Sequence, residues 1–133
     1  MTGPARQPPS ADATLALIRI SMLMGVLLFG AVSWFVHRNP SWRPLNPEAL
    51  PVLRRVMLVV WVLAIVALLA VRPRLERLTG GARRSTLVIA WAIGEGAALF
   101  GGVYFYLSGD ALSFLGGLVV MMAALLLFPI RRE

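Results

Sequence analysis

The chain has 133 residues, of which 59% are hydrophobic and only 14% are charged. In soluble domains about a quarter of all residues are charged. The low charged fraction of this chain therefore excludes an ordinary soluble protein and indicates a chain that lies in lipid. The net charge is +7, all thirteen basic residues are arginine, and the absence of cysteine excludes disulfides and thiolate chemistry. Such exclusive use of arginine, with many Ala, Gly, Leu and Val residues, is typical of a GC-rich bacterial genome.

Four apolar stretches are each long enough to cross a membrane as a helix, which takes about 20 residues. We predict helices over residues 13–37, 48–72, 85–107 and 111–130. Strands of a closed barrel would instead show alternating apolar and polar residues, and these stretches do not alternate. The sequence therefore predicts an all-α integral membrane four-helix bundle. It forms one transmembrane domain over residues 11–133, preceded by a flexible, proline-rich tail over residues 1–10.

The segments between these helices carry signals for helix ends. Ser10 and Asp12 can cap the first helix, and residues 46–48 (Asn-Pro-Glu) can do the same for the second. Residues 79–81 (Thr-Gly-Gly) separate the second helix from the third. Residues 108–110 (Ser-Gly-Asp) make a turn so short that we predict a tight antiparallel hairpin of the third and fourth helices.

The arginines are distributed unevenly between the two predicted sides of the membrane. Nine lie on the side of the two termini and the second connection, against four on the opposite side. Short loops rich in arginine stay in the cytoplasm, so we predict a bacterial inner-membrane protein with both termini cytoplasmic. Five arginines flank the second connection, where we expect contact with anionic lipid headgroups and no need for nucleic acid. These five are Arg72, Arg74, Arg77, Arg83 and Arg84.

The third and fourth predicted helices each carry many small residues on one face, and such faces let helices approach closely in lipid. The packing candidates are Gly94, Ala98, Gly101, Gly102, Gly116 and Gly117. We expect this face to hold the two helices together as a hairpin. The alternative is contact with a second copy or with another membrane chain, and both uses are compatible because the face is wider than one partner needs.

Glu95 is the most unusual residue, because it lies about ten residues from either end of its span and hence near the bilayer midplane. An ionised carboxylate there costs about 2.5 to 3.5 kcal/mol on insertion scales, so it must pair, take up a proton or face water. Arg19 and Arg55 approach a similar depth from opposite sides of the membrane. We predict an intramembrane charge site in which Glu95 forms an ion pair with Arg19 or Arg55. The alternatives are that Glu95 is an ion or proton site, or that its carboxyl group is protonated.

Two families resemble parts of this pattern. Arg83 and Arg84 followed by Glu95 look like the hairpin of rotary ATPase proteolipids, which implies a proton-carrying carboxylate. Residues 56–71, however, lack the glycines of that family's paired helix. Four short helices with one membrane glutamate resemble the small multidrug resistance transporters, whose essential glutamate lies in the first helix, where this chain has Arg19. Neither resemblance assigns a family.

Residues suited to catalysis or metal binding are few. One histidine, no cysteine and six acidic residues form no recognisable nucleophile, carboxylate pair or metal cluster, so we expect no enzyme and no cofactor. We expect His37 at headgroup level and not as a ligand of haem or chlorophyll. The leading hypothesis is a non-catalytic membrane subunit or scaffold that packs by its Gly/Ala face within a larger or homo-oligomeric assembly. The alternative is a small transporter or proton-conducting proteolipid that uses Glu95.

Overall fold

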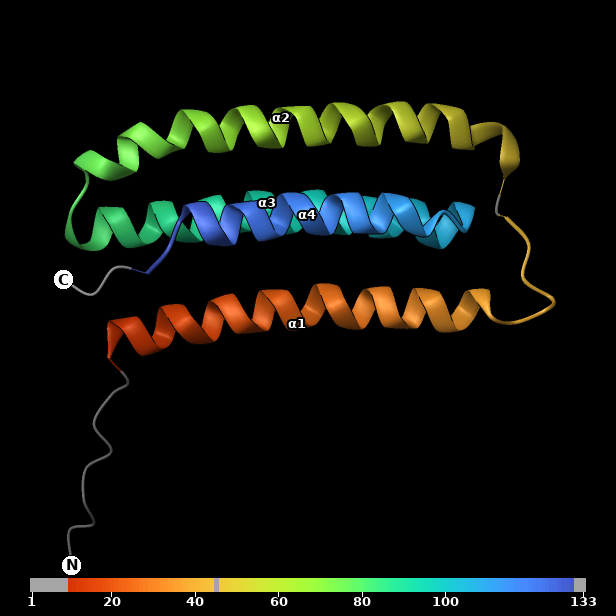
Figure 1. Ribbon diagram of the computed structural model, residues 1–133, viewed down its shortest axis with the longest axis horizontal. Coiled ribbons are helices and arrows are strands. Elements are labelled where there is room, and N and C mark those ends of the chain that lie inside the picture. Colours follow the sequence, from red (N-terminus) through yellow and green to blue (C-terminus); the bar gives the residue numbers. More distant parts are fainter. Residues whose placement is uncertain (1–9, 45, 131–133) are drawn as a thin grey trace, which may run out of the picture.

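The computed structural model describes residues 10–44 and 46–130. This part of the chain forms α1 (Ala11–His37), η1 (a short 3₁₀ helix, Pro47–Ala49), α2 (Leu50–Arg77), α3 (Gly80–Ser108) and α4 (Ala111–Leu127). Figure 1 shows the four long elements side by side, and no strand occurs among the described residues. The predicted all-α four-helix fold is therefore confirmed.

Parts of two predictions lie outside the described residues. All of the predicted tail except Ser10 lies outside the described residues, as do three of the arginines used for orientation, at positions 6, 131 and 132. Ser10 itself caps α1 as expected, since its side-chain oxygen accepts a hydrogen bond from the Ala13 backbone N–H at 3.3 Å.

Three helices, α1, α2 and α3, are long and apolar enough to cross a membrane, which indicates a multi-pass membrane protein. The fourth, α4, is also apolar but has only 17 residues, fewer than the predicted span over 111–130. It ends early because Pro129 has no N–H and forces the preceding residue out of helical geometry. Accordingly, Phe128 has φ −119° and ψ 67°.

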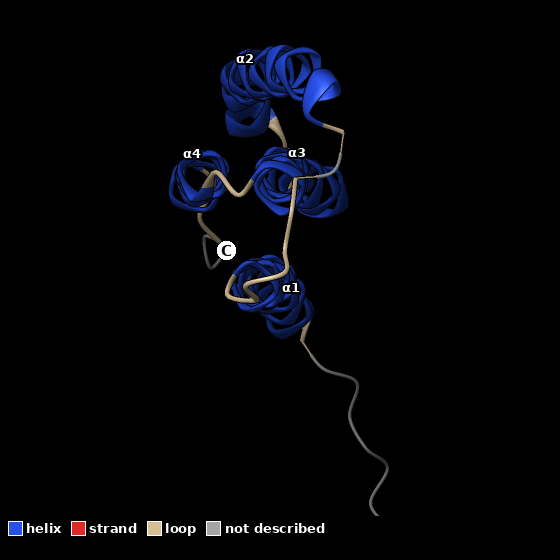
Figure 2. Ribbon diagram, turned by 90° about the vertical axis from the view of Figure 1, so that its right-hand side faces the viewer, coloured by secondary structure: helices blue, strands red, loops and turns tan. Residues whose placement is uncertain are grey.

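The helix α3 lies at the centre of the bundle. Viewed along the helices, α2 and α1 lie on opposite sides of α3 and α4 lies beside it (Figure 2). All three neighbours pack against α3, and its pairing with α4 is the most extensive. The turn between these two helices is the predicted tight hairpin: Gly109 adopts φ +81°, and the Asp110 carboxylate accepts a hydrogen bond from the Leu112 N–H.

The connection between α2 and α3 is shorter than predicted. The second and third helices were expected to stop at residue 72 and start at residue 85, but only Leu78 and Thr79 separate α2 from α3. The helix α2 continues through Pro73, because the next turn buries Leu75 in the core. The five arginines expected to flank a loop therefore lie on the last turns of α2 and the first turns of α3.

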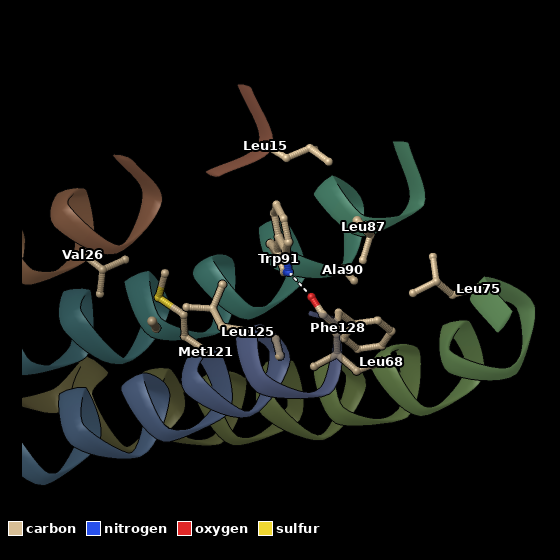
Figure 3. Packing of buried hydrophobic residues seen from close by; sticks show 12 residues of the cluster. Leu15, Val26, Leu68, Leu75, Leu87, Ala90, Trp91, Met121, Leu125 and Phe128 are labelled. Carbon is tan, nitrogen blue, oxygen red and sulfur yellow. Dashed lines mark hydrogen bonds between the residues drawn. The ribbon is translucent and has the colours of Figure 1, made fainter. Parts of the chain in front are cut away.

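The largest fully buried side chains of the core lie near the end of the bundle where α4 stops. Trp91, Met121 and Phe128 have no exposed surface there. In the close view of this region the indole nitrogen of Trp91 points at the backbone oxygen of Phe128 (Figure 3). The core thus surrounds a helix end, whose backbone groups need partners.

Candidate functional site

Arg19 caps the end of α4. Its Nη2 donates a hydrogen bond to the backbone oxygen of Leu125 at 2.9 Å. That carbonyl would normally accept from the residue four positions later, which is Pro129 and has no N–H to give. A cation near a helix C-terminus is also stabilised by the helix dipole, by about 0.3 to 1 kcal/mol at exposed sites. Arg19 therefore satisfies a helix end that lies in apolar surroundings.

Trp91 completes this cap from α3. Its Nε1 donates to the backbone oxygen of Phe128 at 3.0 Å, and its ring lies 5.9 Å from the guanidinium carbon of Arg19, within range of a cation–π contact. Buried backbone N–H and C=O groups need hydrogen-bond partners. Arg19 and Trp91 together meet this condition for the end of α4.

Glu95 lies at the border between two faces of α3. Trp91 and Gly102, on the same side of the helix, meet Arg19 and Phe29 of α1, whereas the neighbouring Ala92 and Leu99 are exposed. The Glu95 side chain is half-buried. Among the described residues it has no hydrogen-bond or ion-pair partner.

The structure does not bring Glu95, Arg19 and Arg55 together. The side chain of Arg19 is directed to α4 and bonded to a backbone carbonyl there. Arg55 lines a hollow with Tyr104, which lies nine residues beyond Glu95 and hence about 13 Å further along the helix. The predicted ion pair is thus absent from the described part of the chain, and Arg19 has a different partner.

Arg54 and Arg55 lie at the start of α2, at the opposite end of the bundle from the α4 cap. With Pro47, Leu58 and Tyr104 they line an open hollow of about 460 Å³. Both arginines are exposed, so water or lipid headgroups can solvate them. This arrangement suits residues at a membrane surface.

The small residues singled out in the sequence lie in contacts between helices of the same chain. A Cβ atom on Gly94 would lie 2.7 Å from Ala124 Cβ, and one on Gly117 would lie 2.8 Å from the Cα of Ala98. A Cβ on Gly102 would meet the ring of Phe29 from α1 at 2.8 Å. The small face therefore joins α3 to α4 and also admits α1.

Trp61 of α2 fills the notch made by the remaining two glycines, a contact that was not predicted from the sequence. A Cβ on Gly101 or on Gly116 would collide with the Trp61 ring or, at Gly101, with the backbone oxygen of Ser113. The Trp61 Nε1 also donates to the backbone oxygen of Ala97 at 3.0 Å. Two glycines facing each other in a predicted hairpin indicate that a large side chain can insert there. They do not tell which aromatic residue of the chain inserts.

His37 is packed among aromatic rings at the end of α1. Its ring lies 4.1 Å from the Trp42 ring and stacks on Phe105 at 4.8 Å between centroids. Its Nδ1 bonds to the backbone oxygen of Ser33, whereas its Nε2 is buried and has no partner among the described residues. The ring thus fastens the loop after α1 to the end of α3. In the described residues, no group of three or more His, Asp or Glu side chains could hold a metal ion.

Comparisons with known proteins give no match. No protein-family model matches the chain, and neither a curated protein nor a solved structure is significantly similar to it. The function is therefore inferred from the residues themselves.

Proposed function

We propose that this protein is a non-catalytic integral membrane subunit or scaffold, held within a larger or homo-oligomeric membrane assembly. The observation that carries the proposal is the half-buried Glu95, which lies at mid-helix on α3 without a partner among the described residues. Near the bilayer midplane, where the sequence places it, a carboxylate must pair, take up a proton or face water. A helix of another chain can supply a pairing partner, because Arg19, one of the two basic candidates within the chain, is bonded to α4.

The surface next to Glu95 suits a partner helix. Ala92 and Gly96 are exposed one turn apart on the outward side of α3, and a Cβ on Gly96 would meet nothing within 4 Å. Small residues four positions apart let a second helix approach closely in lipid. The Gly/Ala face, which was expected to form the hairpin and alternatively to contact a partner, is largely filled by the chain's own helices, so we infer that another chain uses this outward strip.

The experiment is copurification from native membranes in mild detergent, with identification of the chains that remain bound. We expect a stoichiometric partner, or further copies of the chain, to be retained by the wild type and lost in Gly96→Leu and in Glu95→Gln. The matched control is Gly25→Leu, because Gly25 in α1 also has open space around it. Equal retention by Gly96→Leu and the wild type would overturn the proposed surface, and a monomer without companions would overturn the assembly.

Orientation and location belong to the same proposal. The nine-to-four distribution of arginines supports a bacterial inner membrane with both termini in the cytoplasm. A reporter fused after Glu133 should be active in the cytoplasm, and one inserted at Gly109 should be active on the opposite side. A C-terminal reporter found outside the cytoplasm would reverse the assignment.

The alternative function is a small transporter or proton-conducting proteolipid. The same half-buried Glu95 favours it, since a carboxylate without a fixed partner is free to exchange protons or cations. In that case Glu95→Gln should leave assembly intact and abolish proton flux into vesicles. If Glu95→Gln loses the partner and the wild type shows no measurable proton flux, the scaffold function is favoured.

A further inference from the structure

An apolar groove runs between α2 and α4 on the flank of the bundle. It has a volume of about 260 Å³, and its walls include Ile65 and Leu69 of α2 and Val119, Ala123 and Leu127 of α4. Its exposed lining contains only apolar atoms. An α-helix with its side chains is about 10 to 12 Å across, whereas a groove of about 260 Å³ offers room for only part of a hydrocarbon chain.

A charged pocket continues the groove toward the C-terminal end of α2. It has a volume of about 110 Å³ and is lined by Arg72 and Glu76 of α2, Arg83 of α3, and Leu127 and Pro129 at the end of α4. Leu127 lines both the groove and the pocket. Positions 65, 69, 72 and 76 follow one row of α2, because side chains three or four residues apart lie on the same face. The groove and the pocket are therefore adjacent along the same side of α2.

The charges in this pocket select the class of ligand. Two guanidinium groups and one carboxylate give a formal charge of +1, which a single phosphodiester balances. Guanidinium groups bind phosphate oxygens with paired hydrogen bonds, and the Glu76 carboxylate can accept hydrogen bonds from hydroxyl groups. A molecule with a phosphodiester, a hydroxylated headgroup and a long hydrocarbon chain matches both parts.

We propose that this flank binds one anionic glycerophospholipid. Part of one acyl chain lies in the groove between α2 and α4, the phosphate lies between Arg72 and Arg83, and Glu76 receives the headgroup hydroxyls. This site differs from the general attraction of headgroups to basic residues, because it combines two of the five arginines with an apolar channel. It also lies away from the strip at Ala92 and Gly96, so it is independent of the proposed partner surface.

The test is native mass spectrometry of the detergent-purified chain after exposure to phosphatidylglycerol or phosphatidylcholine. We expect one phosphatidylglycerol to remain bound. Each guanidinium that donates hydrogen bonds to the phosphate should strengthen binding about tenfold, so the double variant Arg72→Gln/Arg83→Gln should weaken retention about a hundredfold. The matched control, Arg74→Gln/Arg84→Gln, removes the same charge from exposed positions outside the pocket and should change retention less than about twofold.

A second variant tests the groove separately from the charges. Ala123→Phe places a ring in the apolar channel and should displace the lipid while leaving all arginines in place. Inorganic phosphate, used alone, should not protect the chain from thermal unfolding, because it lacks the acyl chain. Equal losses in the two arginine double variants, equal retention of phosphatidylcholine, full retention by Ala123→Phe, or protection by phosphate alone would each overturn the proposal.

Discussion

Arg19 and Leu125, 106 positions apart in the chain, are joined by a hydrogen bond from a guanidinium to a backbone carbonyl. The bond exists because Pro129 leaves that carbonyl without its usual helical donor. It gives an intramembrane arginine a role in the fold, since a charged donor there satisfies a helix end and lies over the ring of Trp91.

The first prediction isolates this bond with a double-mutant cycle. Arg19→Met removes the donor, and Pro129→Ala restores a backbone N–H that can bond to Leu125 by itself. We expect Arg19→Met to lower the free energy of unfolding by about 1 to 3 kcal/mol more in the wild-type chain than in the Pro129→Ala variant. Unfolding in mixed detergent, followed by circular dichroism, measures the difference. Equal effects in both backgrounds would show that the bond contributes nothing.

Trp91→Phe tests the second donor of the cap. The substitution keeps an aromatic ring but leaves the Phe128 carbonyl without the indole N–H, in a region with no exposed surface. We expect a loss of about 1 to 3 kcal/mol in the free energy of unfolding. Trp34→Phe is the control, because Trp34 is 54% exposed and should tolerate the change. If both variants unfold alike, the indole bond is not needed.

The glycine contacts predict that the same substitution, glycine to leucine, has very different effects on stability at two positions. Gly117→Leu should disrupt the α3–α4 hairpin, since even a Cβ atom there would lie 2.8 Å from backbone atoms of α3, and overpacking typically costs about 1 to 3 kcal/mol or more. Gly25→Leu should fold normally, because nothing in the chain lies within 4 Å of its Cβ position. Thermal stability in detergent compares them, and similar melting temperatures would contradict the close packing.

Glu95→Gln should not destabilise the isolated chain. Without a partner among the described residues, the carboxylate gains nothing from the bundle, and removing its charge saves up to about 2.5 to 3.5 kcal/mol on insertion scales. We expect an unchanged or raised melting temperature for the detergent-purified monomer. A clear drop would mean that Glu95 is paired within the chain after all, as the sequence alone led us to expect.

The fold could be predicted from the sequence because lipid imposes simple rules. Apolar runs of sufficient length must become helices, and a turn as short as residues 108–110 can only join antiparallel neighbours. The helix ends were less predictable. Pro73 suggests a stop, yet burial of Leu75 carries α2 onward to Arg77, and only the packed structure reveals that balance.

The residues of the candidate site could be predicted from the sequence, but the contacts that they make could not. Arg19 and Glu95 stand out in apolar runs, and attraction between opposite charges makes a pair the natural expectation. The long side chain of Arg19 can turn in several directions, however, and the end of α4 lies within its reach. Pro129 is the signal that was available in the sequence, because any proline removes the donor for the carbonyl four residues earlier.

The brevity of α4 gives the protein two hydrophobic thicknesses. Its 17 residues rise about 25 Å, whereas the apolar run of α3, residues 87–107, rises about 31 Å, at about 1.5 Å per residue. Lipid beside a short apolar segment thins locally to match it, at a cost that grows with each ångström of mismatch. The bilayer beside α4 should therefore be thinner than the bilayer beside α3.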